Sequence, residues 1–278
     1  SDERSNTVDT KLTGSRISEL VVVDNTGPII KKHSIKNDKK TVTLFIQCLV
    51  DGIYPEVGNA MVSIFRKLDI PVTCPTEHTC CGQVAFNSGY RKAARVAARK
   101  FVSLFEGAEI IVCPSGSCAY MVKHHYLDLF RNDEKWLRRA RRVGAKTFEL
   151  TEFLVDALGI ESVGANFNGK ATYHDSCHLL RGLGVHEQPR KLIKNIKGLQ
   201  FVEMKNSDRC CGFGGAFSIK YPEISIAILD EKVETILATG ADIVTGCDIG
   251  CLMNIQGRLS RKRSSVKTLH IAQLLAGL

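Results

Sequence analysis

The sequence has no long hydrophobic run, and this absence argues against a membrane-spanning segment. No stretch reaches the roughly 18 consecutive apolar residues that a transmembrane helix needs. The first residues, SDERSNTVDTKLTG, also lack the apolar centre of a secretory signal peptide. We therefore predict a cytoplasmic protein, with the 44% of hydrophobic residues supplying an ordinary core.

Motifs for nucleic-acid binding are absent too, although the formal net charge is +9. Basic residues cluster at 131–146 and 258–267. Runs of this kind fit a nucleic-acid patch, a solvated helix face or a docking surface for an acidic partner protein. Because Trp136 is the one aromatic residue that interleaves the first run, we expect no nucleic-acid binding.

The sequence lacks any Cys-x-x-Cys pair, yet it contains eleven cysteines in 278 residues. Secreted disulfide frameworks are usually short chains with an even cysteine count, and this chain is long with an odd count. Two of its cysteine pairs, Cys80-Cys81 and Cys210-Cys211, are adjacent in sequence. Neighbouring cysteines suit a shared metal better than a bridge to each other, so we predict metal-bound thiolates in a reducing compartment.

Short β-branched apolar runs alternate with amphipathic stretches from residue 41 onward. This alternation predicts an α/β fold with mostly parallel sheets flanked by helices. We predict a flexible arm at 1–40, in which the apolar run 20–23 could form a strand. A first lobe at 41–146, a connecting helix at 147–168 and a second lobe at 169–278 follow.

The two predicted lobes repeat one another. CCGQVAFNSGY at 80–90 matches CCGFGGAFSIKY at 210–221, and GAEIIVCPSGSC at 107–118 matches GADIVTGCDIGC at 240–251. In the first repeat 31 residues separate Cys48 from Cys80, and in the second 32 separate Cys177 from Cys210. Order, spacing and flanking chemistry agree together, which predicts two structurally similar lobes.

Each repeat places four cysteines after predicted strands. Since the carboxyl ends of parallel strands lie at one edge of a sheet, the four cysteines of a repeat can converge there. Gly82 and Gly212 permit the positive φ that turns two neighbouring thiols toward one centre. Cys118 and Cys251 should lie near helix N-termini, which favour thiolates. The predicted ligands are Cys48, Cys80, Cys81, Cys118, Cys177, Cys210, Cys211 and Cys251.

Four thiolates can bind either a zinc ion or an iron–sulfur cluster. Adjacent cysteines are awkward at a single tetrahedral ion, whereas a multi-iron cluster has ligand positions several ångströms apart. The ligand geometry therefore favours iron–sulfur, and zinc stays open as the alternative.

The cysteine motifs resemble the CCG (cysteine-rich) domain, duplicated as in the B subunit of heterodisulfide reductase and in the iron–sulfur subunits of glycolate and glycerol-3-phosphate oxidation. Within this group the chain looks like the A-type proteins of lactate utilisation. The resemblance covers about 44–276 and rests on CLVDGIYPEVG, CCGQVAFNSGY, PSGSC, YHDSCHLLRGLGV, CCGFGGAFSIKYPEIS and GCLMNIQGRL.

The resemblance implies an oxidoreductase subunit that helps to oxidise L-lactate, a small-molecule substrate, to pyruvate. The implied partners are a ferredoxin-like iron–sulfur subunit and a further subunit of the same complex. The implied cofactor is a [4Fe–4S] cluster in one or both lobes, which is non-cubane in the heterodisulfide reductase relatives.

One departure from the family pattern concerns its final Cys-x-x-Cys. Ser115 and Asp248 occupy the first position of that motif in the two repeats. Cys113 and Cys247 lie close by but out of register, and they either replace the missing ligands or are buried strand-end thiols. We favour buried thiols, since free cysteine often behaves as a small core residue. We expect Cys74, which has no counterpart in the second repeat, to lie in the core.

The second repeat surrounds its first cysteine with ionisable residues, His174, Asp175 and His178. Either histidine could take a proton from a hydroxy acid or relay one to a cluster thiolate, and Arg181 could bind a substrate carboxylate. Alternatively, the histidines donate hydrogen bonds to sulfur and Arg181 forms a surface ion pair. The first repeat has no such histidines, so we expect any chemistry in the second lobe.

Three functions remain open from the sequence. The chain could be a redox subunit of a lactate-oxidising complex, with clusters that pass electrons. It could be a zinc- or cluster-stabilised assembly subunit without chemistry of its own. It could also be a thiol–disulfide enzyme similar to heterodisulfide reductase.

Overall fold

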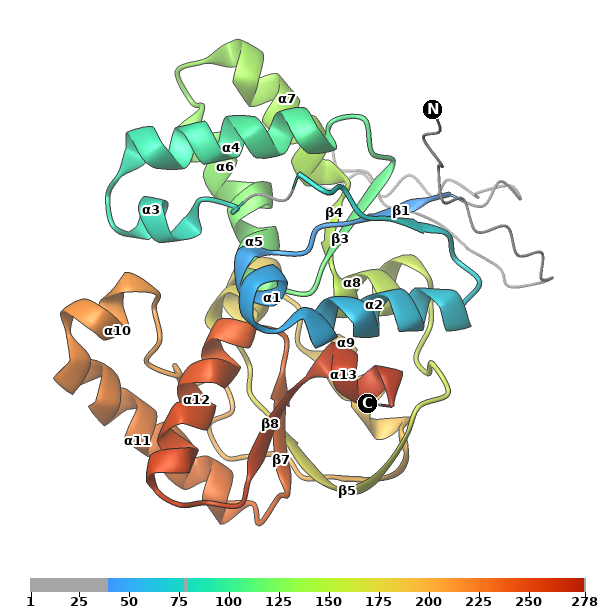
Figure 1. Ribbon diagram of the computed structural model, residues 1–278, viewed down its shortest axis with the longest axis vertical. Coiled ribbons are helices and arrows are strands. Elements are labelled where there is room, and N and C mark those ends of the chain that lie inside the picture. The colour runs from blue at the N-terminus through green and yellow to red at the C-terminus, as the bar shows by residue number, and fades with distance from the viewer. Residues whose placement is uncertain (1–39, 78–79, 278) are drawn as a thin grey trace, which may run out of the picture.

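The computed structural model describes residues 40–77 and 80–277 (Figure 1). The predicted arm, with its apolar run 20–23, lies outside the described residues except for Lys40. In Figure 1 the first lobe runs from blue to green and most of it lies above the second lobe, which runs from yellow to red. No helix within 40–77 or 80–277 is long and apolar enough to cross a membrane.

Each lobe is built on a four-stranded sheet in which all neighbouring strands are parallel. The first sheet has the order β2-β1-β3-β4, with β1 (Val42–Leu44), β2 (Val72–Thr73), β3 (Ile110–Cys113) and β4 (Thr147–Glu149). The second has the order β6-β5-β7-β8, with β5 (Asn166–Tyr173), β6 (Lys197–Phe201), β7 (Ile243–Gly246) and β8 (Lys267–His270). The identical orders confirm the predicted α/β fold and its duplication.

Helices connect the strands on both faces of each sheet. The first lobe contains α1 (Cys48–Ile53), α2 (Pro55–Lys67), α3 (Gln83–Asn87), α4 (Arg91–Phe105), α5 (Gly116–Tyr120), η1 (Met121–His125), α6 (Tyr126–Leu129), α7 (Glu134–Ala145), α8 (Leu150–Glu152) and η2 (Phe153–Ala157). The second contains η3 (His178–Gly182), α9 (Glu187–Lys194), α10 (Ala216–Lys220), α11 (Pro222–Ala238), α12 (Ile249–Arg261) and α13 (Ile271–Ala276). The segments η1, η2 and η3 are π-helical turns.

The segment 147–168 differs from the connecting helix that we predicted. Its first residues form β4, which pairs with β3 and completes the first sheet. The short helical segments α8 and η2 follow, and β5 then starts at Asn166. The sequence pattern favours one amphipathic helix because a strand of three residues leaves too little alternation to be recognised.

The β4–α8 unit is the counterpart of β8–α13 at the end of the second lobe. Glu149 caps α8 and His270 caps α13, and both caps form a capping box with the residue three positions later. Each repeat therefore has four strands and ends in the same strand–cap–helix unit.

The two lobes share one hydrophobic core where α2 packs against α13 (Figure 1). The α2 residues Val57, Met61 and Ile64 are fully buried and lie on one helix face, as their spacing requires. Leu274 and Leu275 of α13 are equally buried. Burial of each such side chain contributes roughly 1.5–3 kcal/mol, so this contact holds the lobes together.

Candidate metal centre

The sheet order determines where the cysteines meet. In each lobe the chain reverses direction across the sheet between the two central strands, β1 and β3 or β5 and β7. Ligand sites in such sheets form outside the carboxyl ends of the strands at this point. Cys48 begins α1 after β1, and Cys118 lies in α5 after β3. Cys177 and Cys251 occupy the same places in the second lobe.

All eight predicted ligand cysteines line a single cavity of about 230 Å³ between the lobes. We predicted convergence within each lobe, and the structure also brings the two sets together. The reason is a reciprocal contact: α5 of the first lobe packs against η3 of the second, and α1 packs against α12. The lobes are thus related by an approximate twofold axis that passes near the cavity.

The first lobe holds its four sulfur atoms in two close pairs. Cys48 Sγ lies 3.9 Å from Cys80 Sγ, and Cys81 Sγ lies 3.4 Å from Cys118 Sγ. Gly82 has a φ of 83°, and its N–H donates to Cys80 Sγ at 3.3 Å. The Cys48 thiol, the neighbouring Cys81 thiol and this N–H lower the pKa of Cys80 to about 2. The same contacts raise the pKa of Cys48 and Cys81, so they favour a single thiolate, the form that binds metals, at Cys80.

The second lobe repeats the turn at its adjacent cysteines. Gly212 has a φ of 77°, and its N–H donates to Cys210 Sγ at 3.3 Å. A Cβ atom at Gly212 would lie 2.4 Å from the carbonyl oxygen of Ser225, so only glycine fits here. Hydrogen bonding to Cys211 and burial raise the pKa of Cys210. Metal binding in this lobe therefore releases thiol protons.

The same pattern is found in known proteins. The cysteine-rich domain family, CCG, matches residues 42–123 and again residues 171–256. This chain belongs to the CCG family. The described fold agrees with the match, since each matched range reaches three of the four strands of a lobe, β5 only in its last three residues, and includes all four cavity-lining cysteines of that lobe.

The chain is also similar to curated family members over most of its length. It is 48% identical over 234 residues to lactate utilization protein A of Bacillus subtilis, covering 84% of this chain and 98% of that protein. It is 49% identical to lactate utilization protein A of Anoxybacillus flavithermus, with the same coverage of both chains. The family resemblance inferred from the motifs is thereby confirmed.

Among solved structures, a hypothetical protein from Helicobacter pylori shares the fold. The TM-score is 0.56 at 13% sequence identity, and the match covers 86% of this chain and 49% of that one. The chain thus spans about half the length of that protein, and the likeness concerns the fold alone.

The two departures from the family's Cys-x-x-Cys contact each other across the lobe interface. The Asp248 carboxylate, at the N-terminus of α12, accepts a hydrogen bond from Ser115 Oγ at 2.8 Å. It also accepts the N–H of Ser117 at 3.1 Å and the hydroxyl groups of Ser117 and Ser176 at 2.7 and 2.5 Å. Asp248 is buried. We refer to these four residues as the Asp248 clasp, and no signal in the sequence paired its members.

Cys113 and Cys247 are fully buried and do not line the cavity. Burial is the main cause of the raised pKa of both thiols. The Cys113 thiol supports the neighbouring Cys118, because its hydrogen bond is the largest contribution to the lowered pKa of Cys118. The Tyr173 hydroxyl lies 3.2 Å from Cys247 Sγ. This placement suits strand-end thiols.

The prediction that Cys74 lies in the core is wrong, because Cys74 is exposed. It follows β2, which has only two residues and forms the edge of the first sheet. A short strand at the edge of a sheet has a neighbouring strand on one side only, so the residue that follows it is exposed. The apolar residues before Cys74 did not indicate that their strand lies at an edge.

The residues predicted to be catalytic lie in different environments. His178 lines the cavity, and its Nδ1 is 3.8 Å from Cys177 Sγ. Burial lowers the pKa of His178, which favours the neutral ring. Arg181 is exposed, does not line the cavity and donates to the Asp208 carbonyl at 3.3 Å. His174 is 1% exposed and lies beside the second-lobe cysteines Cys211 and Cys251.

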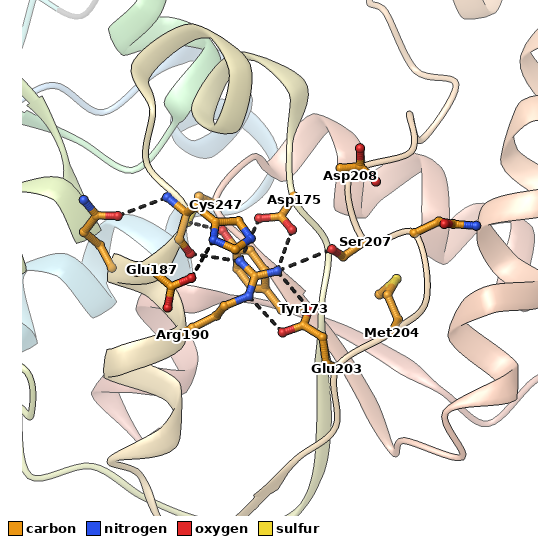
Figure 2. A network of polar contacts seen from close by, with 12 residues as sticks. Tyr173, Asp175, Glu187, Arg190, Glu203, Met204, Ser207, Asp208 and Cys247 are labelled. Carbon is orange, nitrogen blue, oxygen red and sulfur yellow. Dashed lines mark hydrogen bonds and ion pairs between the residues drawn. The ribbon is translucent and has the colours of Figure 1, made fainter.

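Asp175 is held in a buried ion pair (Figure 2). Arg190 donates to both of its carboxylate oxygens, at 2.9 and 2.6 Å, and to both oxygens of Glu203 at 2.8 Å. Burial opposes the charge on Asp175, but the Arg190 hydrogen bonds hold the pKa of Asp175 below its usual value. Asp175 therefore anchors the loop after β5 to α9. Nothing in the sequence pattern pointed to Arg190, which comes from a separate helix.

Proposed function

We propose that this chain is the metal-carrying redox subunit of a lactate-oxidising system, and that its cysteines hold iron–sulfur clusters that pass electrons to a partner subunit. The observation that carries the proposal is the meeting of both cysteine sets at one cavity. We propose lactate as the substrate because the chain is similar to proteins named lactate utilization protein A. Oxidation of lactate to pyruvate releases two electrons and two protons; bound iron–sulfur clusters would accept the electrons one at a time, and the protons would pass to a base or to water.

The protein's own groups prepare the cavity for a charged metal–thiolate group. The N–H groups of Gly82 and Gly212 each donate to a cysteine sulfur. Hydrogen bonds to sulfur are among the features that set the reduction potentials of such clusters. Leu49, Phe213 and Ile249 line the cavity with apolar surface and limit its contact with water.

The proposal extends to the partners and the location. The implied partners are a ferredoxin-like iron–sulfur subunit and a further subunit of the lactate system, and the reducing cytoplasm suits a chain with eleven cysteines. His178 is the residue best placed to move a proton at the cavity, since of the four candidates it alone lines it.

Zinc is the alternative that the same geometry supports. Zinc–sulfur bonds of about 2.3 Å in a tetrahedron place sulfur atoms roughly 3.8 Å apart. The Cys48–Cys80 and Cys81–Cys118 separations of 3.9 and 3.4 Å are close to this value. A zinc-holding chain would stabilise the assembly without passing electrons.

The deciding experiment is metal and sulfide analysis of the full chain purified without oxygen, with electron paramagnetic resonance (EPR) spectroscopy before and after reduction. We expect iron and inorganic sulfide in equal amounts and a signal that changes on reduction. The double variant Cys210→Ser/Cys211→Ser should lose the second-lobe share of the iron. Cys74→Ser, which alters an exposed cysteine away from the cavity, is the matched control and should keep all of it.

Zinc without iron would overturn the redox proposal. If iron is present, the chain is mixed with its partner subunits and L-lactate. Reduction of the iron centres by lactate supports the substrate, whereas intact centres that lactate never reduces would leave the metal site standing and refute the lactate role.

A further inference from the structure

His174 lies directly after β5, beside two of the second lobe's cysteines. Its backbone N–H donates to the Thr245 carbonyl at 2.8 Å, which fixes the residue between β5 and β7. The ligand atoms of His174, Cys211 and Cys251 all lie within 4.8 Å of one another. Atoms this close can bind one metal centre after small side-chain adjustments.

Both ring nitrogens of His174 lack a hydrogen-bond partner among the described residues, although the side chain is 1% exposed. The Ser207 backbone makes only a weak contact with the ring, and the Ser207 carbonyl already accepts the Asp175 N–H at 3.1 Å and Lys232 Nζ at 3.0 Å. Leaving a buried polar group unpaired costs about 1–3 kcal/mol. A metal ion on one nitrogen would remove this cost.

The first lobe shows that the fold does not need an imidazole at this position. Phe45 lies three residues before Cys48, as His174 lies three residues before Cys177. Phe45 is fully buried and packs in one apolar cluster with Cys81 and Cys118, the counterparts of Cys211 and Cys251. An apolar ring thus fills the same place in the first lobe, and the nitrogen atoms of the second lobe require another explanation.

We propose that His174 is a nitrogen ligand of the second-lobe metal centre, together with Cys211 and Cys251, while the first lobe binds its metal through thiolates alone. The inference rests on the proposed function only in that the cavity cysteines bind metal. Iron and zinc both accept mixed imidazole–thiolate ligands. If the centre is an iron–sulfur cluster and the neutral imidazole takes the place of one of the four thiolates, its reduction potential rises above that of the first lobe. Electrons would then collect in the second lobe.

The test begins with the unaltered protein, labelled with ¹⁵N-histidine and purified without oxygen. If the centre is paramagnetic, pulsed EPR detects a histidine nitrogen bound to it. If it is zinc, X-ray absorption detects a nitrogen at about 2.0–2.1 Å. We expect one histidine nitrogen per chain. Metal in both lobes without any histidine nitrogen would refute the inference and leave the proposed function intact, whereas a chain without bound metal would refute both.

The variant His174→Phe assigns the nitrogen to this residue, because it copies the ring found in the first lobe. We expect it to lose the nitrogen signal and to weaken second-lobe metal binding at least about tenfold. His124→Phe, which replaces an exposed histidine of the first lobe, is the control and should change neither. A nitrogen signal that persists in a folded His174→Phe protein would overturn the assignment. If this variant fails to fold, His174→Cys replaces it, with the signal expected to change from nitrogen to sulfur.

Discussion

The Asp248 clasp makes a strong prediction about stability, because one carboxylate joins the two lobes. Asp248 accepts four hydrogen bonds, three of them from residues of the first lobe, and is 5% exposed. Hydrogen bonds to a charged group contribute about 1.5–3 kcal/mol each, so four would total about 6–12 kcal/mol if they were additive. Removing the carboxylate also removes its desolvation cost of several kcal/mol. We therefore expect Asp248→Ala to lower the free energy of unfolding by about 3–5 kcal/mol.

The measurement is urea unfolding of the anaerobically purified chain, followed by circular dichroism. Asp248→Asn, which keeps one acceptor oxygen but loses the charge, should fall between the wild type and Asp248→Ala. The control is Asp230→Ala. Asp230 differs in that its partners are two cations, Arg258 and Lys262, and its side chain is 27% exposed. Exposed pairs of this kind are worth about 1 kcal/mol or less.

The shape of the unfolding curve gives a second result. Loss of the clasp should reduce the cooperativity between the lobes, so that unfolding of Asp248→Ala becomes broader or separates into two steps. The clasp does not hold the lobes together if Asp248→Ala costs no more than Asp230→Ala and unfolds in an equally sharp single step.

Three further predictions concern the rest of the framework. Burial raises the pKa of Glu149 from 4.5 to about 7, so the free energy of unfolding should fall by up to about 3 kcal/mol as the pH rises through this range. Glu149→Gln should remove this fall, and it would be contradicted if the free energy of unfolding changed with pH in the same way in both proteins. Arg190→Met should lower the free energy of unfolding by about 3–5 kcal/mol, because Asp175 is left buried without its partner. In denaturant titrations the double variant Asp175→Leu/Arg190→Met should recover most of this loss, and equal stability of the single and double variants would rule it out. Gly212→Ala should destabilise the protein more than Gly82→Ala, because the Cβ added at position 212 meets a backbone oxygen at 2.4 Å and the Cβ added at position 82 meets a methyl group at 3.1 Å. The melting temperature of Gly212→Ala should therefore be the lower of the two, and the reverse order would contradict this.

The duplication, the parallel sheets and the convergence of the cysteines were predictable from the sequence. Strands and helices can be recognised from the local periodicity of apolar residues. Because the carboxyl ends of parallel strands lie at one edge of a sheet, the place of each cysteine after its strand then predicts where it lies. The positive φ at Gly82 and Gly212 followed from the need to turn two neighbouring thiols toward one centre. These inferences needed no knowledge of how the lobes pack.

What the sequence did not predict depends on contacts between distant segments. The single shared cavity, the Asp248 clasp and the Arg190–Asp175 pair all require the relative placement of elements that are separate in the chain. The exposure of Cys74 depends on β2 being an edge strand, which the run of residues around it does not encode. Single-sequence patterns indicate which face of an element is apolar, and they do not indicate what covers it.

The approximate twofold relation between the lobes has a consequence for the origin of the Asp248 clasp. A protein with a single repeat would form this arrangement as a symmetric dimer, with the same residue at the positions of Ser115 and Asp248. Two aspartates there would repel each other, and two serines would form a bond without charge. The observed donor on one side and acceptor on the other require two halves that differ. Because both lobes belong to one chain, every molecule pairs the lobe that carries Asp248 with the lobe that carries Ser115.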